Sequence, residues 1–344
     1  TMDPVTQGAL GAALPQSMRV KWSGHRKTHA ALAGLFGMLG GMAADLDILI
    51  SSSADPLLFL TYHRQFTHSF VFVPFGGFIV ALFLYGILRR RWTIGFWQTA
   101  LLCSLGYATH ALLDTATSYG TMLLWPFSEA RFSWSIISIV DPLFTLPLMA
   151  SVLMAGVRNE PRYARIGLAW ALLYLGAGWF QHQAAREVAE SLATSRGHMP
   201  LRYEIKPSVG NLLVWRSVYE TEDRFFVDAV RVGIARKVFE GTSVSKLYLA
   251  RDFPWLEPNS QQARDIGRFG HFSDGFIVVD PAKPNRILDV RYSFVPNEVN
   301  ALFSIELSEE AGPTEHVRYQ PHRENAREQF DRLLRIMFDG GAGN

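Results

Sequence analysis

The chain has 344 residues, of which 49% are hydrophobic, and its formal net charge is only +2. This small charge, with no basic cluster interleaved with aromatic residues, argues against a nucleic-acid partner. The single cysteine, Cys103, excludes an internal disulfide framework. The length suffices for two domains, and the apolar residues are unevenly spread. Long apolar runs fill residues 1 to about 182, whereas charged and apolar residues alternate from about residue 195 onward.

Apolar segments in the first half predict membrane helices, because about 20 helical residues at ~1.5 Å each cross a hydrocarbon core about 30 Å thick. The first segment is only weakly apolar and is expected to be a short helix shielded by others, with Asp3 as its N-cap and Pro4 in its first turn. Gly37 and Gly41 form a GxxxG step, which permits close helix packing. The predicted helices cover residues 3–18, 29–50, 67–88, 93–114, 136–156 and 163–181.

The second half reads as a mostly β module with a terminal helix. Its predicted strands are 211–219, 224–232, 275–279, 286–294 and 299–307, and its predicted helix is 325–338. The expected fold is therefore an α-helical membrane bundle of about six helices in residues 1–190, followed by a mostly β (α+β) soluble domain in residues 195–344.

The basic residues predict the orientation of the bundle. They gather in the turns 19–28, 89–92 and 158–165, which lie on one side if there are six helices. The positive-inside rule makes that side cytoplasmic. We therefore expect a multi-pass protein of a bacterial inner membrane, with an extracytoplasmic C-terminal domain. The ionisable residues of the opposite side cost about 2.5–3.5 kcal/mol each within a membrane and need a compensating partner, which a divalent cation provides.

Histidines and aspartates at the extracytoplasmic ends of the predicted helices have the composition of a metal site. His110 and Asp114 share a helix face because they are four residues apart. The expected ligands are Asp45, Asp47, His63, His68, His110 and Asp114. They would hold one or two divalent ions; zinc is the expected metal, with manganese or magnesium as alternatives. Such a metal generates a nucleophilic hydroxide and polarises a phosphoryl or carbonyl oxygen.

Three further residues are assigned catalytic roles. Arg64 would hold a phosphate or stabilise developing negative charge, Thr67 would orient a ligand or the substrate, and Asp141 is counted with the site. Each assignment has an alternative. Arg64 fits a side chain that reaches the lipid headgroups, and Asp141, like Asp3, fits a helix cap before a proline. The pair His110–Asp114 can be structural, and Asp45 and Asp47 can be polar caps facing water, or one of them can support a ligand.

The segments Asp3–Thr6, Gly41–Asp47, His63–Ser69, His110–Asp114 and Trp125–Phe127 resemble, in order, the bacterial membrane-bound metal-dependent hydrolases of the YdjM type. The resemblance covers the membrane half and extends to Asp289–Tyr292. It implies a multispanning inner-membrane protein with a metal site and hydrolase activity. The chain departs from the family pattern at Gln7, where a histidine is typical, and at Ala44, where proline is common. If that histidine is a metal ligand in the relatives, a two-metal site in this chain would lack one imidazole.

The predicted function is metal-dependent hydrolysis at the extracytoplasmic membrane face. A catalytic metal at headgroup depth would meet membrane lipid, so a lipid or lipid-linked phosphoester is the expected substrate, and the C-terminal domain would cap the site. Two alternatives remain: a non-enzymatic metal-binding transporter, or an interaction module in which the β domain recruits a partner. The sequence does not define the oligomeric state.

Overall fold

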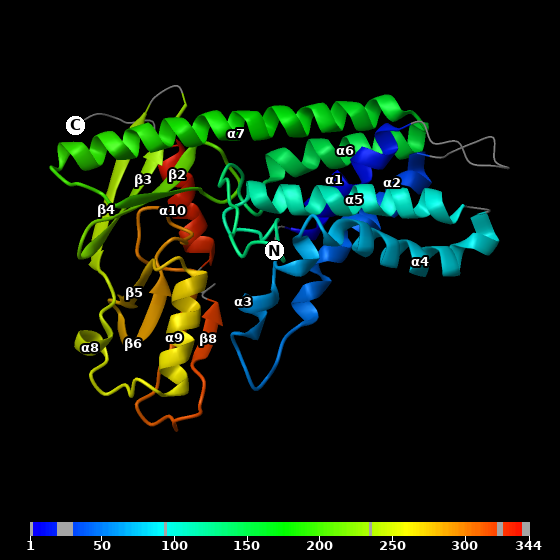
Figure 1. Cartoon of the computed structure of the whole chain (residues 1–344). Helices are drawn as coiled ribbons and strands as arrows, with labels where there is room; N and C mark the ends of the chain where they lie inside the picture. The colour runs from blue at the N-terminus through cyan, green and yellow to red at the C-terminus, as the bar shows by residue number, and fades with distance from the viewer. Residues whose placement is uncertain (1–2, 19–29, 93–94, 234–235, 322–325, 339–344) are drawn as a thin grey trace. The chain divides into compact units, whose positions relative to one another are not determined.

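The computed structural model describes residues 3–18, 30–92, 95–233, 236–321 and 326–338 (Figure 1). The chain divides into two compact units. Unit 1 comprises Thr1–Leu49 and Tyr62–Trp179, and unit 2 comprises Ile50–Thr61 and Phe180–Asn344. Residues 50–61 thus belong to the same unit as the C-terminal part of the chain, although they lie between two helical segments of unit 1.

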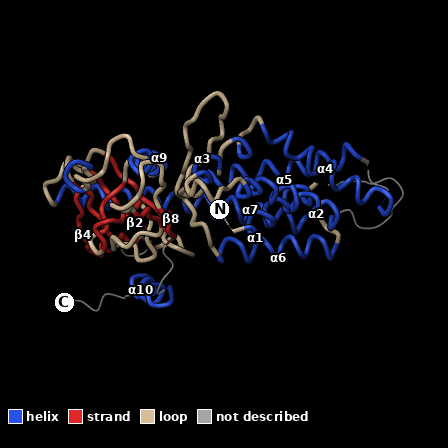
Figure 2. The backbone as a smooth tube through the Cα atoms, turned by 90° about the horizontal axis from the view of Figure 1, so that it is seen from below, coloured by secondary structure: helices blue, strands red, loops and turns tan. Residues whose placement is uncertain are grey.

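Unit 1 is built from helices and loops, and all the named strands of the described chain belong to unit 2 (Figure 2). A helix occupies each of the six ranges in which the sequence predicts one. The helices of the first 195 residues are α1 (Pro4–Ser17), α2 (Ala30–Ala43), the 3-10 helix η1 (Ala44–Leu49), α3 (Leu58–Tyr62), the 3-10 helix η2 (Phe66–His68), α4 (Phe72–Trp92), α5 (Phe96–Ala116), α6 (Pro142–Arg158) and α7 (Pro161–Ser195). The helical character of the first half is therefore confirmed.

The length and composition of some of these helices fit a membrane crossing. Among the described residues, two helical stretches, Ala30–Leu49 and Phe72–Arg90, are long and apolar enough to cross a membrane, and Pro142–Arg158 is a shorter apolar helix. Many apolar side chains on α4 to α7 are exposed rather than packed inside. Those with more than half of their surface exposed in unit 1 include Phe75, Ile79, Leu82, Phe83, Ile87, Trp97, Leu101, Leu143, Leu146, Leu153, Val157, Ile166, Leu172 and Leu173.

Two of the helices begin with an aspartate followed by a proline, as their sequences predict. The Asp3 carboxylate accepts hydrogen bonds from the backbone N–H groups of Val5 and Thr6 at the start of α1. Asp141 accepts one from the N–H of Phe144 at the start of α6. Proline suits the position after such a cap because its missing N–H would lack a helical partner anyway.

Glycines allow α2 to approach α1 and α5 closely. A Cβ on Gly37 would collide with the carbonyl oxygen of Gly11 in α1, and a Cβ on Gly106 of α5 would collide with the carbonyl oxygen of Gly37. Gly41 meets Gly11 and the backbone oxygen of Gln7. The predicted GxxxG step therefore does serve close helix packing.

Contacts at both ends of unit 1 show the relative directions of α1, α2, α6 and α7. At one end the N–H of Asp3 donates to the carbonyl of Ile139, just before α6. At the other end Ala30 N–H donates to Asn159 after α6, and Arg165 of α7 donates to the Ser17 carbonyl at the end of α1. Arg158, Arg162 and Arg165 thus lie at the end opposite to the starts of α1 and α6. The predicted basic turn 19–28 lies outside the described residues.

Unit 2 contains two four-stranded antiparallel sheets, each in sequential strand order. The strands are β1 (Arg202–Pro207), β2 (Val214–Glu220), β3 (Arg224–Arg231), β4 (Lys237–Ser245), β5 (Ile277–Asp280), β6 (Lys283–Asp289), β7 (Phe303–Glu306) and β8 (Arg318–Pro321). The helices are α8 (Leu249–Asp252), α9 (Gln261–Phe272) and α10 (Ala326–Phe338). The C-terminal antiparallel sheet domain is confirmed, although β1, β4, β8, α8 and α9 were not predicted.

Helix α7 runs 14 residues beyond its predicted end at residue 181. The reason is packing: Ala185 and Ala189 are fully buried in one core cluster with Trp215 of β2 and Val230 of β3. On the other sheet face, Leu333 of α10 packs with Val214 and Ala229. The apolar stripe of a helix is therefore covered by the sheet in both cases.

Candidate metal centre

Three separate parts of unit 1 bring acidic and imidazole side chains to one end of its helices. Asp45 and Asp47 lie in η1, directly after α2, and His63 to His68 lie in the turn before α4. His110 and Asp114 occupy the last two turns of α5. The alternating direction of the helices places the end of α2, the start of α4 and the end of α5 together.

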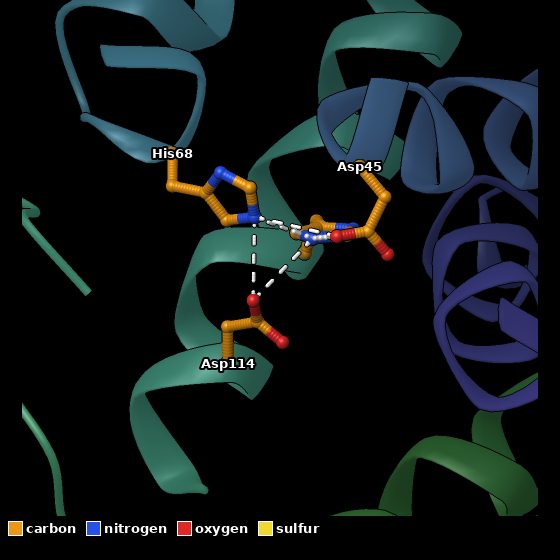
Figure 3. A group of neighbouring side chains, drawn as sticks. Asp45, His68 and Asp114 are labelled. Atoms are coloured by element: carbon orange, nitrogen blue, oxygen red, sulfur yellow. Dashed lines mark hydrogen bonds and ion pairs between the residues drawn. The ribbon is translucent and has the colours of Figure 1, made fainter. Parts of the chain in front are cut away.

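Four side chains converge on a common point (Figure 3). The Nε2 atoms of His68 and His110 are 2.9 Å apart. From Asp114 Oδ2, the Nε2 of His68 is 3.2 Å away and that of His110 is 3.6 Å away. From Asp45 Oδ1, the same two nitrogens are 3.7 Å and 3.4 Å away.

These separations fit one tetrahedral metal ion. Ligand atoms about 2.0–2.1 Å from such an ion lie about 3.3–3.4 Å from one another, which is the middle of the range measured here. His68, His110 and Asp114 are fully buried, and only Asp45 retains some exposure. The cluster could therefore bind a metal ion, and its geometry does not identify which one.

Two buried carboxylate oxygens give a second argument for a ligand. Asp45 Oδ1 and Asp114 Oδ2 accept no well-aligned hydrogen bond from any described residue, although Asp114 Oδ2 is paired with Arg64 Nε at 2.9 Å. A buried carboxylate oxygen without a hydrogen bond costs about 1–3 kcal/mol or more. Both atoms belong to the converging set of four, so a cation between them would satisfy both at once.

Hydrogen bonds to the other ring nitrogens orient the two imidazoles. His110 Nδ1 lies 2.5 Å from the carbonyl oxygen of Gly41, so that nitrogen carries the proton and donates, which leaves Nε2 free to bind a metal. His68 Nδ1 lies 2.9 Å from the Thr67 hydroxyl, which itself donates to Asp47 Oδ2 at 2.8 Å. Such partners of ligand histidines fix the ring orientation and raise its basicity.

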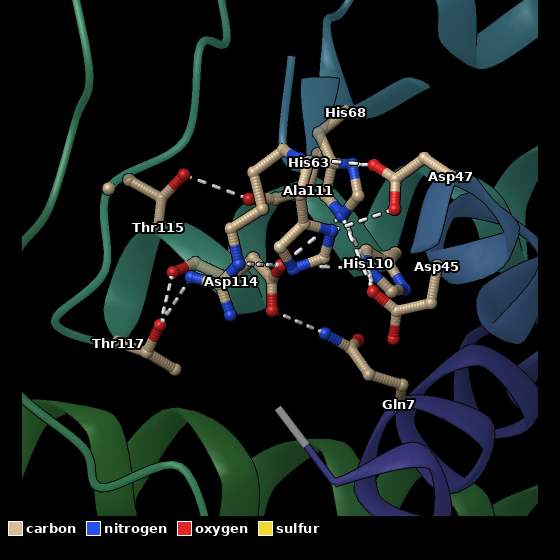
Figure 4. Close-up of polar contacts among 12 residues, drawn as sticks. Gln7, Asp45, Asp47, His63, His68, His110, Ala111, Asp114, Thr115 and Thr117 are labelled. Atoms are coloured by element: carbon tan, nitrogen blue, oxygen red, sulfur yellow. Dashed lines mark hydrogen bonds and ion pairs between the residues drawn. The ribbon is translucent and has the colours of Figure 1, made fainter. Parts of the chain in front are cut away.

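Asp47 and His63 form, with Asp45, a second group whose ligand atoms lie within 4.8 Å of one another (Figure 4). Both oxygens of Asp47 are already engaged. Oδ1 lies 2.7 Å from His63 Nδ1, and Oδ2 accepts the Arg64 backbone N–H as well as the Thr67 hydroxyl. Asp47 thus orients His63, Arg64 and Thr67 through hydrogen bonds, and neither of its oxygens is free of such a bond.

Arg64 is 1% exposed and its guanidinium is held inside the site. Its Nε lies 2.9 Å from Asp114 Oδ2, its Nη1 donates to Thr117 at 3.0 Å, and its Cζ lies over the Tyr119 ring, 5.2 Å from the ring centroid. The second terminal nitrogen, Nη2, donates to none of the described residues. The backbone of Arg64 has φ +60°, a left-handed conformation that costs a non-glycine residue about 1–2 kcal/mol.

The sequence did not predict the other contacts of the site, although the family pattern had drawn attention to Gln7. Gln7 of α1 donates to Asp114 Oδ1 at 2.8 Å, while its own oxygen is buried without a partner among the described residues (Figure 4). Tyr107 donates to the Thr67 carbonyl. Thr117 could have been suspected only from its position three residues after Asp114.

Asp141 lies outside both groups of potential ligands. Its buried carboxylate caps α6 and accepts a hydrogen bond from the Tyr174 hydroxyl at 2.8 Å. Asp3 is likewise a cap, and its carboxylate also accepts the hydroxyl of Thr6. The structure therefore brings together every expected metal ligand with Arg64 and Thr67, but not Asp141.

A helical unit with a buried His/Asp cluster, followed by an antiparallel sheet domain, defines the class of this protein. The model of the YdjM inner membrane protein family matches residues 2–185, which is more than half of the chain and includes all the residues of the cluster. The chain therefore belongs to the YdjM inner membrane protein family, as the sequence motifs indicated.

Two curated proteins are similar to parts of the chain. The inner membrane protein YbcI of Escherichia coli (strain K12) is 33% identical over 107 residues, 30% of this chain and 60% of YbcI. The uncharacterized protein YfhP of Bacillus subtilis (strain 168) is 25% identical over 138 residues, 40% of this chain and 39% of YfhP. The matches thus span less than two thirds of either relative. No solved structure shows significant similarity to the chain.

Proposed function

We propose that this protein is a multi-pass membrane hydrolase that depends on a divalent metal, with zinc as the expected ion and a lipid or lipid-linked phosphoester as the substrate. The observation that carries the proposal is the convergence of Asp45, His68, His110 and Asp114, with the buried Oδ1 of Asp45 accepting no hydrogen bond from the described residues. Nitrogen and carboxylate ligands in this number are typical of zinc.

The exposed apolar surface of unit 1 supports the membrane part of the proposal. Soluble monomers rarely expose contiguous apolar patches larger than a few hundred Å², whereas α4, α6 and α7 each expose several large apolar side chains. Six helices alternating in direction would bring the site to one face and Arg158, Arg162 and Arg165 to the other. The positive-inside rule then favours an extracytoplasmic site and an extracytoplasmic C-terminal domain.

The residues around the cluster are suited to hydrolysis. A bound divalent ion would act as a Lewis acid that polarises a phosphoryl or carbonyl oxygen and activates water. Arg64 would donate from its free Nη2 to an oxyanion, and its pairing with Asp114 and Thr117 fixes its direction in advance. His63 is the more exposed imidazole, and its pairing with Asp47 holds it ready to take up a proton.

The depth of the site favours a lipid-like substrate. Asp45 is the partly exposed member of the cluster, and Leu46, Ile48 and Leu49 beside it are exposed apolar side chains. A polar reaction centre flanked by exposed apolar groups suits an amphipathic molecule, whose headgroup would reach the metal while its chains stay in the membrane.

The test is metal content combined with turnover of lipid phosphoesters by the purified protein. His110→Ala is the sharper variant, because it removes one potential ligand, and outside the cluster the ring bonds to the Gly41 carbonyl alone among the described residues. We expect it to lose the metal and the activity. The matched control is His271→Ala, at an exposed histidine of α9 in unit 2, which should keep both.

Three results would contradict parts of the proposal. Wild-type protein that contains no stoichiometric metal would reject the metal site. Metal without hydrolysis of any lipid phosphoester would reject the reaction, and metal flux into liposomes would favour the transporter alternative.

A further inference from the structure

The chain between Asp47 and His63 forms a loop that is closed at its base. The side chains of these two residues are bonded to each other, with Asp47 Oδ1 2.7 Å from His63 Nδ1. Both belong to unit 1 and adjoin the proposed metal cluster. Residues 50–61 between them belong to unit 2, so the chain leaves unit 1 three residues after Asp47 and returns one residue before His63.

The tip of this loop is part of the hydrophobic core of unit 2. Leu57 is 0% and Leu60 is 7% exposed, and both lie in one core cluster with Phe253, Ile266, Phe269, Ile287, Ile305, Leu307 and Val317. Phe59 also meets the ring of Tyr319 edge-on at 5.0 Å. Segment 50–61 is thus folded with the C-terminal sheet domain rather than with the helices that precede and follow it.

A two-pronged ion pair fastens the same segment. Arg268 of α9 donates from Nη1 to Asp55 Oδ1 and from Nη2 to Asp55 Oδ2, each at 2.9 Å. Burial alone would raise the pKa of Asp55, but the hydrogen bonds from Arg268 and Leu57 lower it, so Asp55 is charged at neutral pH. Asp265 lies 3.2 Å from Arg268, and His316 lies 2.8 Å from Asp265 and 3.9 Å from Asp55. Two parallel hydrogen bonds between an arginine and a carboxylate fix the relative orientation of both groups, which a single bond from a lysine would not do.

Short hydrogen-bonded elements join the loop tip to the site. Helix α3 carries Leu60 in the core of unit 2 and ends at Tyr62, next to His63. The Tyr62 carbonyl then accepts the N–H of Gln65, and Arg64 between them is in the left-handed conformation. The chain therefore runs without a break from Leu60, in the core of unit 2, to the backbone of His63 and Arg64.

From this connectivity we infer that the C-terminal domain positions the metal site, and that Arg268 is a positioning residue that acts through Asp55 and the loop 48–62. The inference rests on the proposed metal centre. It gives the sheet domain a role in assembling the site: Asp47 and His63 are held at the two ends of a segment that unit 2 anchors. Arg268 itself touches none of the potential metal ligands in the described structure.

The test compares Arg268→Gln with Arg264→Gln in the full-length protein. Both arginines lie on α9, but Arg264 bonds only to Gln261 and Asn259 among the described residues. Zinc affinity is measured by competition with a chromophoric chelator. We expect Arg268→Gln to bind zinc about tenfold more weakly at unchanged stoichiometry, because Asp47 and His63 beside the cluster would be held less firmly; loss of a group that directly supports a ligand costs about 10–100-fold. Arg264→Gln should match the wild type, and Arg268→Lys should recover part of the affinity.

A purely structural role of Arg268 gives a different result. In that case Arg268→Gln would lower the melting temperature while zinc affinity stayed equal to that of Arg264→Gln, and the inference would be wrong. Leu60→Val is a second probe of the same loop and should also weaken zinc binding. Failure of the wild type to bind zinc would instead reject the proposed metal centre.

Discussion

Asp114 joins most of the interactions of the site through its two oxygens. Oδ1 accepts from Gln7, whereas Oδ2 lies close to His68, His110 and Arg64. Removal of this carboxylate would leave the buried guanidinium of Arg64 without an ionic partner in the described part of the chain, which typically costs about 3–5 kcal/mol. Loss of activity in an Asp114 variant would therefore combine lost metal with lost stability, which is why His110 is the better residue for the functional test.

Thr67 offers a test of the supporting hydrogen bonds. Thr67→Val keeps the side-chain shape but removes the hydroxyl that links Asp47 to His68 Nδ1. We expect metal affinity to fall about 10–100-fold while the metal stoichiometry is kept. Equilibrium metal binding checks this result.

The matched control for that variant is Thr109→Val. Thr109 is also 8% exposed, and among the described residues its hydroxyl donates only to the Gly106 carbonyl of its own helix. It should bind metal like the wild type. Equal affinities of the two variants would show that the Thr67 hydroxyl does not orient His68.

At the level of secondary-structure elements, close packing of α2 between α1 and α5 sets the geometry of the site. Asp45 follows α2 and His110 belongs to α5, so their separation depends on how closely these helices approach. The approach is limited by backbone atoms, since a Cβ on Gly106 would meet the backbone of Gly37 rather than a movable side chain. Overpacking of this kind typically costs about 1–3 kcal/mol.

Gly106→Ala should therefore destabilise unit 1 by about 1–3 kcal/mol and weaken metal binding. Gly86→Ala on α4 is the control, because a Cβ there meets nothing within 4 Å; it should be neutral or stabilise the helix by up to about 1 kcal/mol. Thermal unfolding in detergent measures both. Equal melting temperatures would show that α2 and α5 can separate without cost.

At the level of the whole molecule, the proposed orientation makes a prediction that labelling can check. Ser53 in the loop of unit 2 and Glu160 in the turn between α6 and α7 are both exposed. Cysteines placed there should react from opposite sides of the membrane. The native Cys103 is fully buried and should contribute little background.

In intact cells, a membrane-impermeant maleimide should label Ser53→Cys, and it should label Glu160→Cys only after permeabilisation. The physical reason is the cytoplasmic retention of turns rich in arginine. The reverse pattern would place the site on the cytoplasmic side. Labelling of both residues from one side would reject the alternating six-helix crossing.

The sequence by itself determined the helical elements and several of their ends. The long apolar runs and the Asp-Pro starts of α1 and α6 depend on neighbours in the chain, so local patterns suffice to predict them. In unit 2 the same reasoning found β2 and β3 but missed α9, although its polar and apolar residues alternate at helical spacing. It also ended α7 too early, because the apolar partners of Ala185 and Ala189 lie on distant strands.

Only the tertiary structure decided which side chains of the site have a free ligand atom and which are already hydrogen-bonded to their neighbours. The sequence supplied His68, His110, Asp45, Asp47 and Asp114 as residue types, but the free oxygen of Asp45 and the occupied oxygens of Asp47 follow from contacts between segments far apart in the chain. The assignment of residues 50–61 to the sheet domain was likewise beyond local patterns. Leu57 and Leu60 belong to the sheet domain because they are buried against residues about 200 or more positions later in the chain. The local sequence pattern around residues 50–61 carries no information about partners so distant.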